Sequence, residues 1–402
     1  MKSSLRLNNT VLILSCMGTG LFLWLLLSLG RDYVPYVRIP STKTVDVAGG
    51  EDSAAAASTE SVPGQTLITD TTPEHIPNTA HYVYILANVT GDFSFAFSEV
   101  LSIYATWRYW QPDAIYLHTN APAEALERAR SGAAGKWTRL LFQVPNLRIA
   151  AVTVPTHAGN GKAITLMEHK SDFVRVQAVR EYGGVYLDFD VHPLRDVRTL
   201  RESGFSAVAG RQAGDSNAEV NSGVFMSRPH SRMMELWSEG INAAFTGEWS
   251  AHSNGALTTI CERLVSQPGE VLIMERNAFA PGGWVRDETI RLLEVHADET
   301  PALDMMTPDG RLPQYDDEPM TRWAAPQAVQ RPVWAQDWSK TYMLHAFNHN
   351  QGDFEIPGFH RITPRYILER RSNMARAVYP VAKELFEQGL IDIDDPYKFN
   401  ID

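Results

Sequence analysis

Short apolar runs alternate with longer amphipathic segments through most of the chain after residue 80. We expect strands where β-branched and aromatic residues cluster, and helices where apolar residues recur every three or four positions. The predicted strands are 81–87, 114–118, 148–154 and 185–191, and the predicted helices are 95–109, 123–131 and 162–182. This β-α-β-α order predicts an α/β fold with a mostly parallel central sheet and helices on both faces.

The pattern becomes mixed after Phe205. The composition predicts strands at 207–211 and 223–227, and helical periodicity predicts helices at 233–244 and 256–266. Segment 300–338 is rich in Pro and Asp and is expected to form loops. A strand-like stretch, 342–347, then precedes a helical region, 366–388, which Pro380 should interrupt.

The N-terminal part has a different character. An uncharged stretch, 11–29, is long enough to cross a bilayer as a helix. Lys2 and Arg6 precede it, so the positive-inside rule places residues 1–10 in the cytoplasm as a short tail. A cleavable signal peptide is the alternative, but the stretch exceeds the usual ~7–15 apolar residues of such peptides, which favours a retained anchor.

Residues 30–78 are rich in Ser, Thr, Ala and Pro and have no sustained apolar period. This composition is typical of a flexible stem. We therefore expect a transmembrane signal anchor, a stem and a lumenal domain at 79–402, in that order.

Charge and cysteine content narrow the class of protein. The formal net charge is −11 and no basic patch offsets it, which argues against a nucleic-acid partner. Of the two cysteines, Cys16 lies in the predicted anchor, so Cys261 has no disulfide partner in the predicted lumenal domain. Because Cys261 lies among apolar residues at helical spacing, we expect it to be a small buried hydrophobic side chain. One sequon, Asn88-Val-Thr90, follows the first predicted strand.

The run Tyr182-Gly-Gly-Val-Tyr-Leu-Asp188-Phe-Asp190 carries the clearest chemical signal. A strand places residues i and i+2 on one face, so Asp188 and Asp190 should point together beyond the strand's carboxyl end. Two carboxylates this close need a cation between them, and hard oxygen ligands suit Mg²⁺ or Mn²⁺, which also bind substrate phosphates. The motif therefore predicts a metal–diphosphate site at the edge of an α/β sheet.

The spacing of Ser171-Asp172, Arg175, the glycine pair and Asp188-x-Asp190 resembles the signature of glycosyltransferase family 32, which contains fungal Golgi α-mannosyltransferases. Three later positions are similar to further motifs of that family: Asn221, Asn254 with Gly255, and His345. The Ser-Trp pair that usually follows the family's late histidine is absent here.

The resemblance implies a GT-A fold, which is Rossmann-like, a nucleotide-sugar donor, Mn²⁺ or Mg²⁺, and retention of the anomeric configuration. Together with the anchor, it implies a single-pass type II protein of the Golgi membrane. It implies that Asp190 is a direct metal ligand, that Asp188 contacts metal-bound water or ribose, and that His345 completes the metal shell.

The resemblance also assigns roles to individual side chains. Asp172 would accept hydrogen bonds from sugar hydroxyls, and Arg175 would face phosphate or hold Asp172 in place. The residues implied as catalytic are Asp172, Arg175, Asp188 and Asp190, and those implied in binding the donor are Asp172, Tyr182, Gly184, Asp188, Asn221 and Asn254. No residue stands out as a covalent nucleophile, so a front-side displacement is the default mechanism.

Donor and acceptor stay open at this level. GDP-mannose is favoured by the fungal branch of the family, with UDP-galactose or UDP-glucose as alternatives, and the acceptor is a glycan, a glycolipid or an inositol phospholipid. An aromatic group of Trp338, Tyr342 and Phe347 either packs in the core or forms a sugar platform.

Two other functions compete with the transferase. One is a non-catalytic, membrane-anchored protein that binds glycans or acts as a scaffold. The other is a phosphohydrolase that uses the first Asp as its nucleophile. Such enzymes carry Thr or Val two residues after the second Asp, whereas this chain has His192 there.

Overall fold

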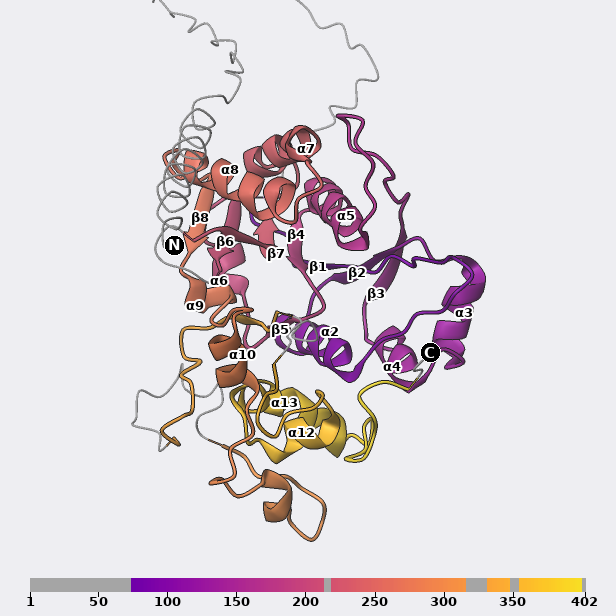
Figure 1. Cartoon of the computed structure of the whole chain (residues 1–402), viewed down its shortest axis with the longest axis vertical. Helices are drawn as coiled ribbons and strands as arrows, with labels where there is room; N and C mark the ends of the chain where they lie inside the picture. Colours follow the sequence, from indigo (N-terminus) through magenta and orange to yellow (C-terminus); the bar gives the residue numbers. More distant parts are fainter. Residues whose placement is uncertain (1–73, 213–217, 316–330, 348–353, 400–402) are drawn as a thin grey trace, which may run out of the picture. The chain divides into compact units, whose positions relative to one another are not determined.

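The structure, a computed structural model, describes residues 74–212, 218–315, 331–347 and 354–399 of the 402-residue chain. The strands are β1 (Thr79–Val83), β2 (Ala114–Thr119), β3 (Leu147–Ala151), β4 (Gly184–Leu187), β5 (Val191–Pro193), β6 (Ala207–Arg211), β7 (Val220–Ser227), β8 (Val271–Met274) and β9 (Met343–His345). The α-helices are α2 (Phe97–Trp110), α3 (Ala123–Ser131), α4 (Lys136–Phe142), α5 (Met167–Tyr182), α6 (Arg198–Arg201), α7 (Arg232–Ala244), α8 (Ala256–Leu264), α9 (Arg276–Phe279), α10 (Arg286–Leu293), α12 (Pro364–Glu369) and α13 (Asn373–Glu387). A short π-helix, η1 (Ala251–Gly255), and a 3₁₀-helix, η2 (Ala302–Met305), complete the described elements (Figure 1).

The central sheet has seven strands in the order β3-β2-β1-β4-β7-β6-β8. Strand β7 runs antiparallel to both neighbours, and the other pairs in the sheet are parallel. The predicted mostly parallel sheet is thus confirmed, with one reversed strand that the sequence reading did not anticipate. The reason is the connection: residues 212–219 between β6 and β7 are too few for the crossover that a parallel pair requires.

Helices cover both faces of this sheet, as predicted. In β4, Val185 and Leu187 pack into a core shared with α2, α4 and α13, whereas Tyr186 packs into a second core with α5, α7 and α8. The alternation follows from the strand period of two. Cys261 in α8 is buried in this second core, with its Sγ 3.6 Å from Sδ of Met233, and burial raises the pKa of its thiol to about 12. The prediction of a buried hydrophobic cysteine is confirmed.

Residues Thr69–Asp402 form one compact unit by their mutual contacts. The predicted tail at 1–10, anchor at 11–29 and most of the stem at 30–78 lie outside the described residues, so they stay predictions. Within the described ranges, no helix combines the length and the hydropathy that a bilayer span needs.

Several predicted boundaries need correction. The helix expected at 162–182 begins at Met167, because residues 156–164 form a turn in which the Ala158 amide donates to the Lys162 carbonyl at 2.9 Å and the Ile164 amide to the Thr156 carbonyl at 2.8 Å. The helical region 366–388 is two helices, and Pro380 lies inside α13 rather than at the break. The break comes at Arg370, which has a φ of 60°, and Ser372 restarts the helix by accepting a hydrogen bond from the Ala375 amide.

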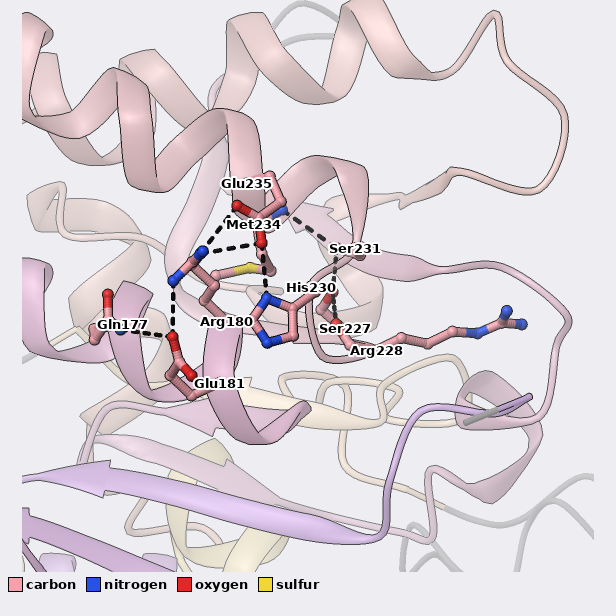
Figure 2. A network of polar contacts seen from close by, with 9 residues as sticks. All are labelled: Gln177, Arg180, Glu181, Ser227, Arg228, His230, Ser231, Met234 and Glu235. Atoms are coloured by element: carbon pink, nitrogen blue, oxygen red, sulfur yellow. Dashed lines mark hydrogen bonds and ion pairs between the residues drawn. The ribbon is translucent and has the colours of Figure 1, made fainter. Parts of the chain in front are cut away.

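A polar network fixes the end of α5 against α7. Arg180 donates from Nε to both carboxylate oxygens of Glu235, at 3.1 Å each, and from Nη1 to Glu181 at 2.7 Å (Figure 2). His230, between β7 and α7, meets the same Glu235 through Nδ1 at 2.8 Å. Exposed ion pairs contribute only about 0–1 kcal/mol each, so this network serves to position α5 more than to stabilise the fold.

The glycine pair after α5 lets the helix turn at once into β4. Gly183 and Gly184 both have positive φ values, 63° and 104°. A Cβ on Gly184 would lie 2.1 Å from Oγ1 of Thr79 and 2.6 Å from the Thr79 carbonyl oxygen. Only glycine tolerates both the dihedral and the close approach to β1, so this pair fixes where β4 begins.

Two buried histidines join β1 and β2 on the sheet. Nε2 of His81 lies 2.7 Å from the carbonyl oxygen of Gly183, which can only accept, so this nitrogen carries a proton. Nδ1 of His81 then accepts from Nε2 of His118 at 2.9 Å. Burial, with the neighbouring His118 acting in the same direction, lowers the pKa of His81 to about 3, and burial lowers the pKa of His118 to about 4.

This pair makes the fold sensitive to acid. Since both folded pKa values lie below the ordinary 6.5, the unfolded chain binds more protons as the pH falls from 6.5 toward 4, and the free energy of unfolding falls with it. We expect a loss of about 2 kcal/mol per histidine between pH 6.5 and pH 5. Denaturant unfolding of the His118→Gln variant should show a shallower pH slope than the wild type. The exposed His157→Gln variant is the control, and equal slopes for all three proteins would contradict the assignment.

Candidate active site

A cavity of about 840 Å³ opens at the carboxyl ends of β1 and β4, where ligands bind in sheets of this kind. Residues from eight separate parts of the chain line it: 83–85, 99, 167–175, 188–190, 212 with 219–223, 249–254, 284 and 345–347. The predicted site residues on its wall are Asp172, Arg175, Asp188, Asp190, Asn221, Asn254 and His345. The structure therefore brings together all the predicted site residues except Tyr182 and Gly184.

Asp188 and Asp190 converge through a turn, which corrects the prediction that one strand carries both. Strand β4 ends at Leu187, and the next hydrogen bond joins the Asp188 amide to the Gly223 carbonyl at 2.8 Å. The Asp188 carbonyl then accepts from the Val191 amide at 3.0 Å, which closes a turn before β5. The turn orients both carboxylates toward the cavity.

His345 reaches the same place through strand pairing. Its strand, β9, pairs antiparallel with β5 so that His345 is opposite Val191, and the Ala346 amide donates to the Asp190 carbonyl at 2.8 Å. Nε2 of His345 lies 3.4 Å from Oδ1 of Asp190. One side-chain atom from each of Asp188, Asp190 and His345 lies within 4.8 Å of the others, a spacing that suits a single metal ion.

Asn221 and Phe347 hold the imidazole of His345. Nδ2 of Asn221 lies 2.7 Å from Nδ1 of His345, while Oδ1 of Asn221 accepts from the Gly223 amide at 2.6 Å. The ring of Phe347 stacks on the imidazole with centroids 3.9 Å apart. Asn221 thus contacts Nδ1 of His345, and Nε2 of the same ring faces Asp190.

Gly223 creates the space in which these groups meet. A Cβ at this position would lie 2.7 Å from Oδ2 of Asp188, 2.7 Å from Cε1 of His345 and 3.0 Å from Oδ1 of Asn221. Two carboxylates and an imidazole around a bare backbone form a donor set that fits Mn²⁺ or Mg²⁺. The residues present therefore fit the metal that the motif predicted.

Arg175 ties the carboxylates together from behind. Its Nη2 lies 3.2 Å from Oδ1 of Asp172 and 3.1 Å from Oδ1 of Asp188, and its Nη1 donates to the Ser222 carbonyl at 3.0 Å. The guanidinium lies 4.6 Å above the ring of Tyr186, whose hydroxyl donates to Asp188 at 2.6 Å. Of the two predicted roles for Arg175, holding Asp172 in place is the one that these contacts match.

The charges of Arg175 and Asp188 shift each other's pKa values. Burial raises the pKa of Asp188 and Asp190 adds to this, while Arg175 opposes it. Burial acts to lower the pKa of Arg175, but the carboxylates of Asp188 and Asp172 raise it on balance. Arg175 thus stays charged and compensates part of the carboxylate repulsion.

Sequence reasoning missed His252 and Glu99. His252 lies in η1, is fully buried, and places Nε2 2.9 Å from Oδ2 of Asp172. Glu99 in α2 lines the cavity, and its pKa rises to about 7, chiefly because of burial and despite a hydrogen bond from the Ala96 amide. Neither residue belongs to a recognisable motif. Only the folding of the chain brings them to the site, so the sequence carried no signal for them.

Asn254 lies in the cavity wall, whereas Gly184 and Tyr182 lie away from the cavity. Oδ1 of Asn254 accepts from the Ser222 amide at 2.9 Å, so this side chain supports the cavity wall. Gly184 lies at the amino end of β4, roughly 10 Å of strand away from the carboxyl end. Tyr182 stacks on Tyr116 at 5.1 Å and lines a different cavity of about 450 Å³.

The region of the chain that contains this site is similar to the DXD region of glycosyltransferases, which makes a glycosyltransferase the class of protein. Residues 98–206, which include Asp172, Arg175, Asp188 and Asp190, match the family model described as the glycosyltransferase sugar-binding region containing DXD motif. The resemblance seen in the sequence is confirmed by this match.

Individual relatives are more distant. Glucan organizing enzyme 1 from Cryptococcus neoformans var. grubii is 26% identical over 224 residues, which are 53% of this chain and 56% of that protein. The chain thus spans little more than half the length of this relative. Among solved structures, the PaToxG glycosyltransferase is similar at 14% identity and a TM-score of 0.34, over 49% of this chain and 72% of that one. The apo form of GlyE from Streptococcus pneumoniae TIGR4 is similar at 12% identity and a TM-score of 0.37, over 80% of this chain and 64% of that one.

The lack of a side chain at Gly223 predicts that a substitution there weakens metal binding specifically. In Gly223→Ala the new Cβ would force Asp188 and His345 apart, so we expect Mn²⁺ affinity to fall by about 10-fold or more while the chain stays folded. Calorimetric titration with Mn²⁺ measures this. Gly240→Ala is a matched control, since nothing lies within 4 Å of a Cβ built there. Equal metal affinity in both variants would show that the three ligands do not form the site.

The ion pairs of Arg175 with Asp172 and Asp188 predict a large loss of stability when the arginine is replaced. Arg175→Met would leave Asp172 and Asp188 without their buried partner, which should lower the free energy of unfolding by about 3–5 kcal/mol. Arg180→Met, which removes a guanidinium from the partly exposed network of Figure 2, should cost about 1 kcal/mol or less. Denaturant unfolding at neutral pH compares the two. A loss in Arg175→Met no greater than in the control would contradict a compensating role for this residue.

Proposed function

We propose that this protein transfers a hexose from a nucleotide-sugar donor to a glycan or glycolipid acceptor, with a divalent cation bound by Asp188, Asp190 and His345. The observation that carries the proposal is the convergence of these three side chains on the wall of the large cavity, with Asp188 and Asp190 contributed by the DXD region and His345 by a distant strand. The donor set suits Mn²⁺ or Mg²⁺, with Asp190 as the more direct ligand and His345 beside it.

The charge of the cavity supports a need for the cation. Among the described residues that line it there are six carboxylates and one guanidinium, and that guanidinium is already paired with Asp172 and Asp188; the carboxylates are Glu99, Glu168, Asp172, Asp188, Asp190 and Glu219. A nucleoside diphosphate would meet strong repulsion from such a wall. A bound divalent cation would offset this repulsion and supply Lewis-acid stabilisation of the departing diphosphate.

The chain's own residues would position the donor sugar. Asp172 is held from both sides, by Arg175 at Oδ1 and by His252 at Oδ2. Each oxygen keeps a further lone pair, so the carboxylate can still accept hydrogen bonds from sugar hydroxyls. Such a fixed acceptor would orient the sugar ring for attack at its anomeric carbon without paying for reorganisation during the reaction.

The finer features of the proposal come from the resemblance to glycosyltransferase family 32. They are retention of configuration by a front-side route, GDP-mannose as the favoured donor with UDP-hexoses as alternatives, and a type II position in the Golgi membrane. The name of the similar cryptococcal protein refers to glucan, so a glucan acceptor is a candidate beside mannose-containing glycans.

A non-catalytic glycan-binding or scaffold protein is the second candidate. It would need no cation, and six carboxylates around a cavity would then only weaken the fold. The phosphohydrolase alternative has less support, because His192, where those enzymes carry Thr or Val, is buried in β5 away from solvent.

Donor hydrolysis tests the proposal. The full chain in mild detergent should slowly hydrolyse one of GDP-mannose, UDP-galactose and UDP-glucose in the presence of Mn²⁺, and chelation of the metal should abolish this. Asp190→Asn should lower the rate at least about 100-fold, because the variant loses a charged ligand. Asp287→Asn, an exposed carboxylate on α10, should match the wild type. Hydrolysis that survives chelation and Asp190→Asn would refute the metal-dependent transferase.

A further inference from the structure

Two exposed tryptophans line the cavity that holds the candidate metal ligands. Trp249 is 62% exposed and Trp284 is 54% exposed, whereas the other tryptophans in the described ranges are buried or half-buried. Leaving such a side chain in water forgoes about 1.5–3 kcal/mol of burial. Because both indoles line the cavity, a ligand bound there would cover part of this exposed surface.

The two tryptophans come from opposite layers of the fold. Trp249 lies between α7 and η1, in the layer that packs on one face of the sheet, and Trp284 lies between α9 and α10, in the layer on the other face. Figure 1 shows α7 and α10 on different sides of the strands. The cavity thus receives one indole from each layer.

Each tryptophan connects through neighbouring rings to a residue of the candidate site. The Trp284 ring lies 5.3 Å from that of Phe347, which stacks on the candidate ligand His345 at 3.9 Å. The Trp249 ring lies 5.9 Å from that of His169, which lies 4.7 Å from His252, the partner of Asp172. Both rows of rings therefore lead from the exposed surface toward the reacting centre.

The charge of the cavity restricts what can lie on these rings. Its described lining contains six carboxylates and one paired guanidinium, so a phosphorylated or otherwise anionic acceptor would be repelled. The carboxylates of Glu168 and Glu219, in contrast, offer acceptors for hydroxyl groups. A neutral sugar matches both features, since its C–H face packs on an indole while its hydroxyls donate hydrogen bonds at the edge.

We propose that Trp249 and Trp284 form an acceptor subsite for a neutral hexopyranose unit of a glycan, beside the DXD site. This inference rests on the proposed function for its place in the reaction. It also revises the aromatic platform considered from the sequence. Trp338 is only 4% exposed and Tyr342 packs against the core, so of that group only Phe347 lies in the cavity wall.

Direct binding tests the subsite without any need for turnover. Calorimetry on the full chain, with Mn²⁺ and without donor, would use mannobiose, laminaribiose and galactobiose as neutral probes and myo-inositol phosphate as the anionic one. We expect at least one neutral probe to bind, and Trp249→Ala and Trp284→Ala each to weaken it about 10-fold. Val285→Ala is the matched control, because Val285 neighbours Trp284 and is 50% exposed but does not line the cavity. Binding of the inositol phosphate alone, or of no neutral probe to the folded protein, would overturn the proposal.

Kinetics then separate the subsite from the donor site. In both tryptophan variants the KM for the acceptor should rise about 10-fold, whereas donor hydrolysis and the KM for the donor should stay at the wild-type values. A loss of donor hydrolysis with an unchanged acceptor KM would assign the indoles to the donor and overturn the proposal. If the wild type binds a neutral disaccharide through the tryptophans but hydrolyses no donor, the transferase proposal fails and the sugar subsite stands.

Discussion

The buried guanidinium of Arg175 is the interaction on which the rest of the site depends. It contacts Asp172 on its own helix and Asp188 after β4, and so joins the two elements that the glycine pair connects. Without this cation, carboxylates would approach one another in a partly desolvated wall, which costs several kcal/mol per unpaired charge. Arg175 forms ion pairs with Asp172 and Asp188, whereas the carboxylate of Asp190 faces the imidazole of His345.

Different residues of the site fix the carboxylates and shape the space around them. Arg175, Tyr186 and His252 fix the inner carboxylates by hydrogen bonds and ion pairs. Gly223 supplies space in addition to its two backbone hydrogen bonds, since any side chain there would fill the point where Asp188 and His345 meet. Rings then extend outward from His345 to Phe347 and Trp284, and from His252 to His169 and Trp249, so aromatic side chains flank the polar centre on both sides.

Much of this could be read from the sequence, for local reasons. The order of the strands and of most helices from 79 to 187 follows the apolar periods, although α4 was not predicted and several ends differ by a few residues. The positions of Asp172 and Arg175 on one helical face follow from a spacing of three. The turn after Leu187 was not readable, because Asp188 to Val191 has the composition of a continuing strand. Pro380 was misleading for a related reason: a proline predicts a break, yet the caps at Ser372 and Thr363 decide where α12 and α13 begin.

The sequence by itself determined the chemistry of the centre, because Asp-x-Asp after an apolar strand, an arginine on the preceding helix and a glycine pair are local features with local physical causes. Tertiary structure alone decided which distant residues complete it. His345 comes to Asp190 through the pairing of β9 with β5, and His252 comes to Asp172 through a π-helix that follows α7. Partners that are 80 or more residues apart in the chain depend on loop closure and core packing rather than on composition. The two exposed tryptophans belong to the same category, since exposure is a property of the folded surface.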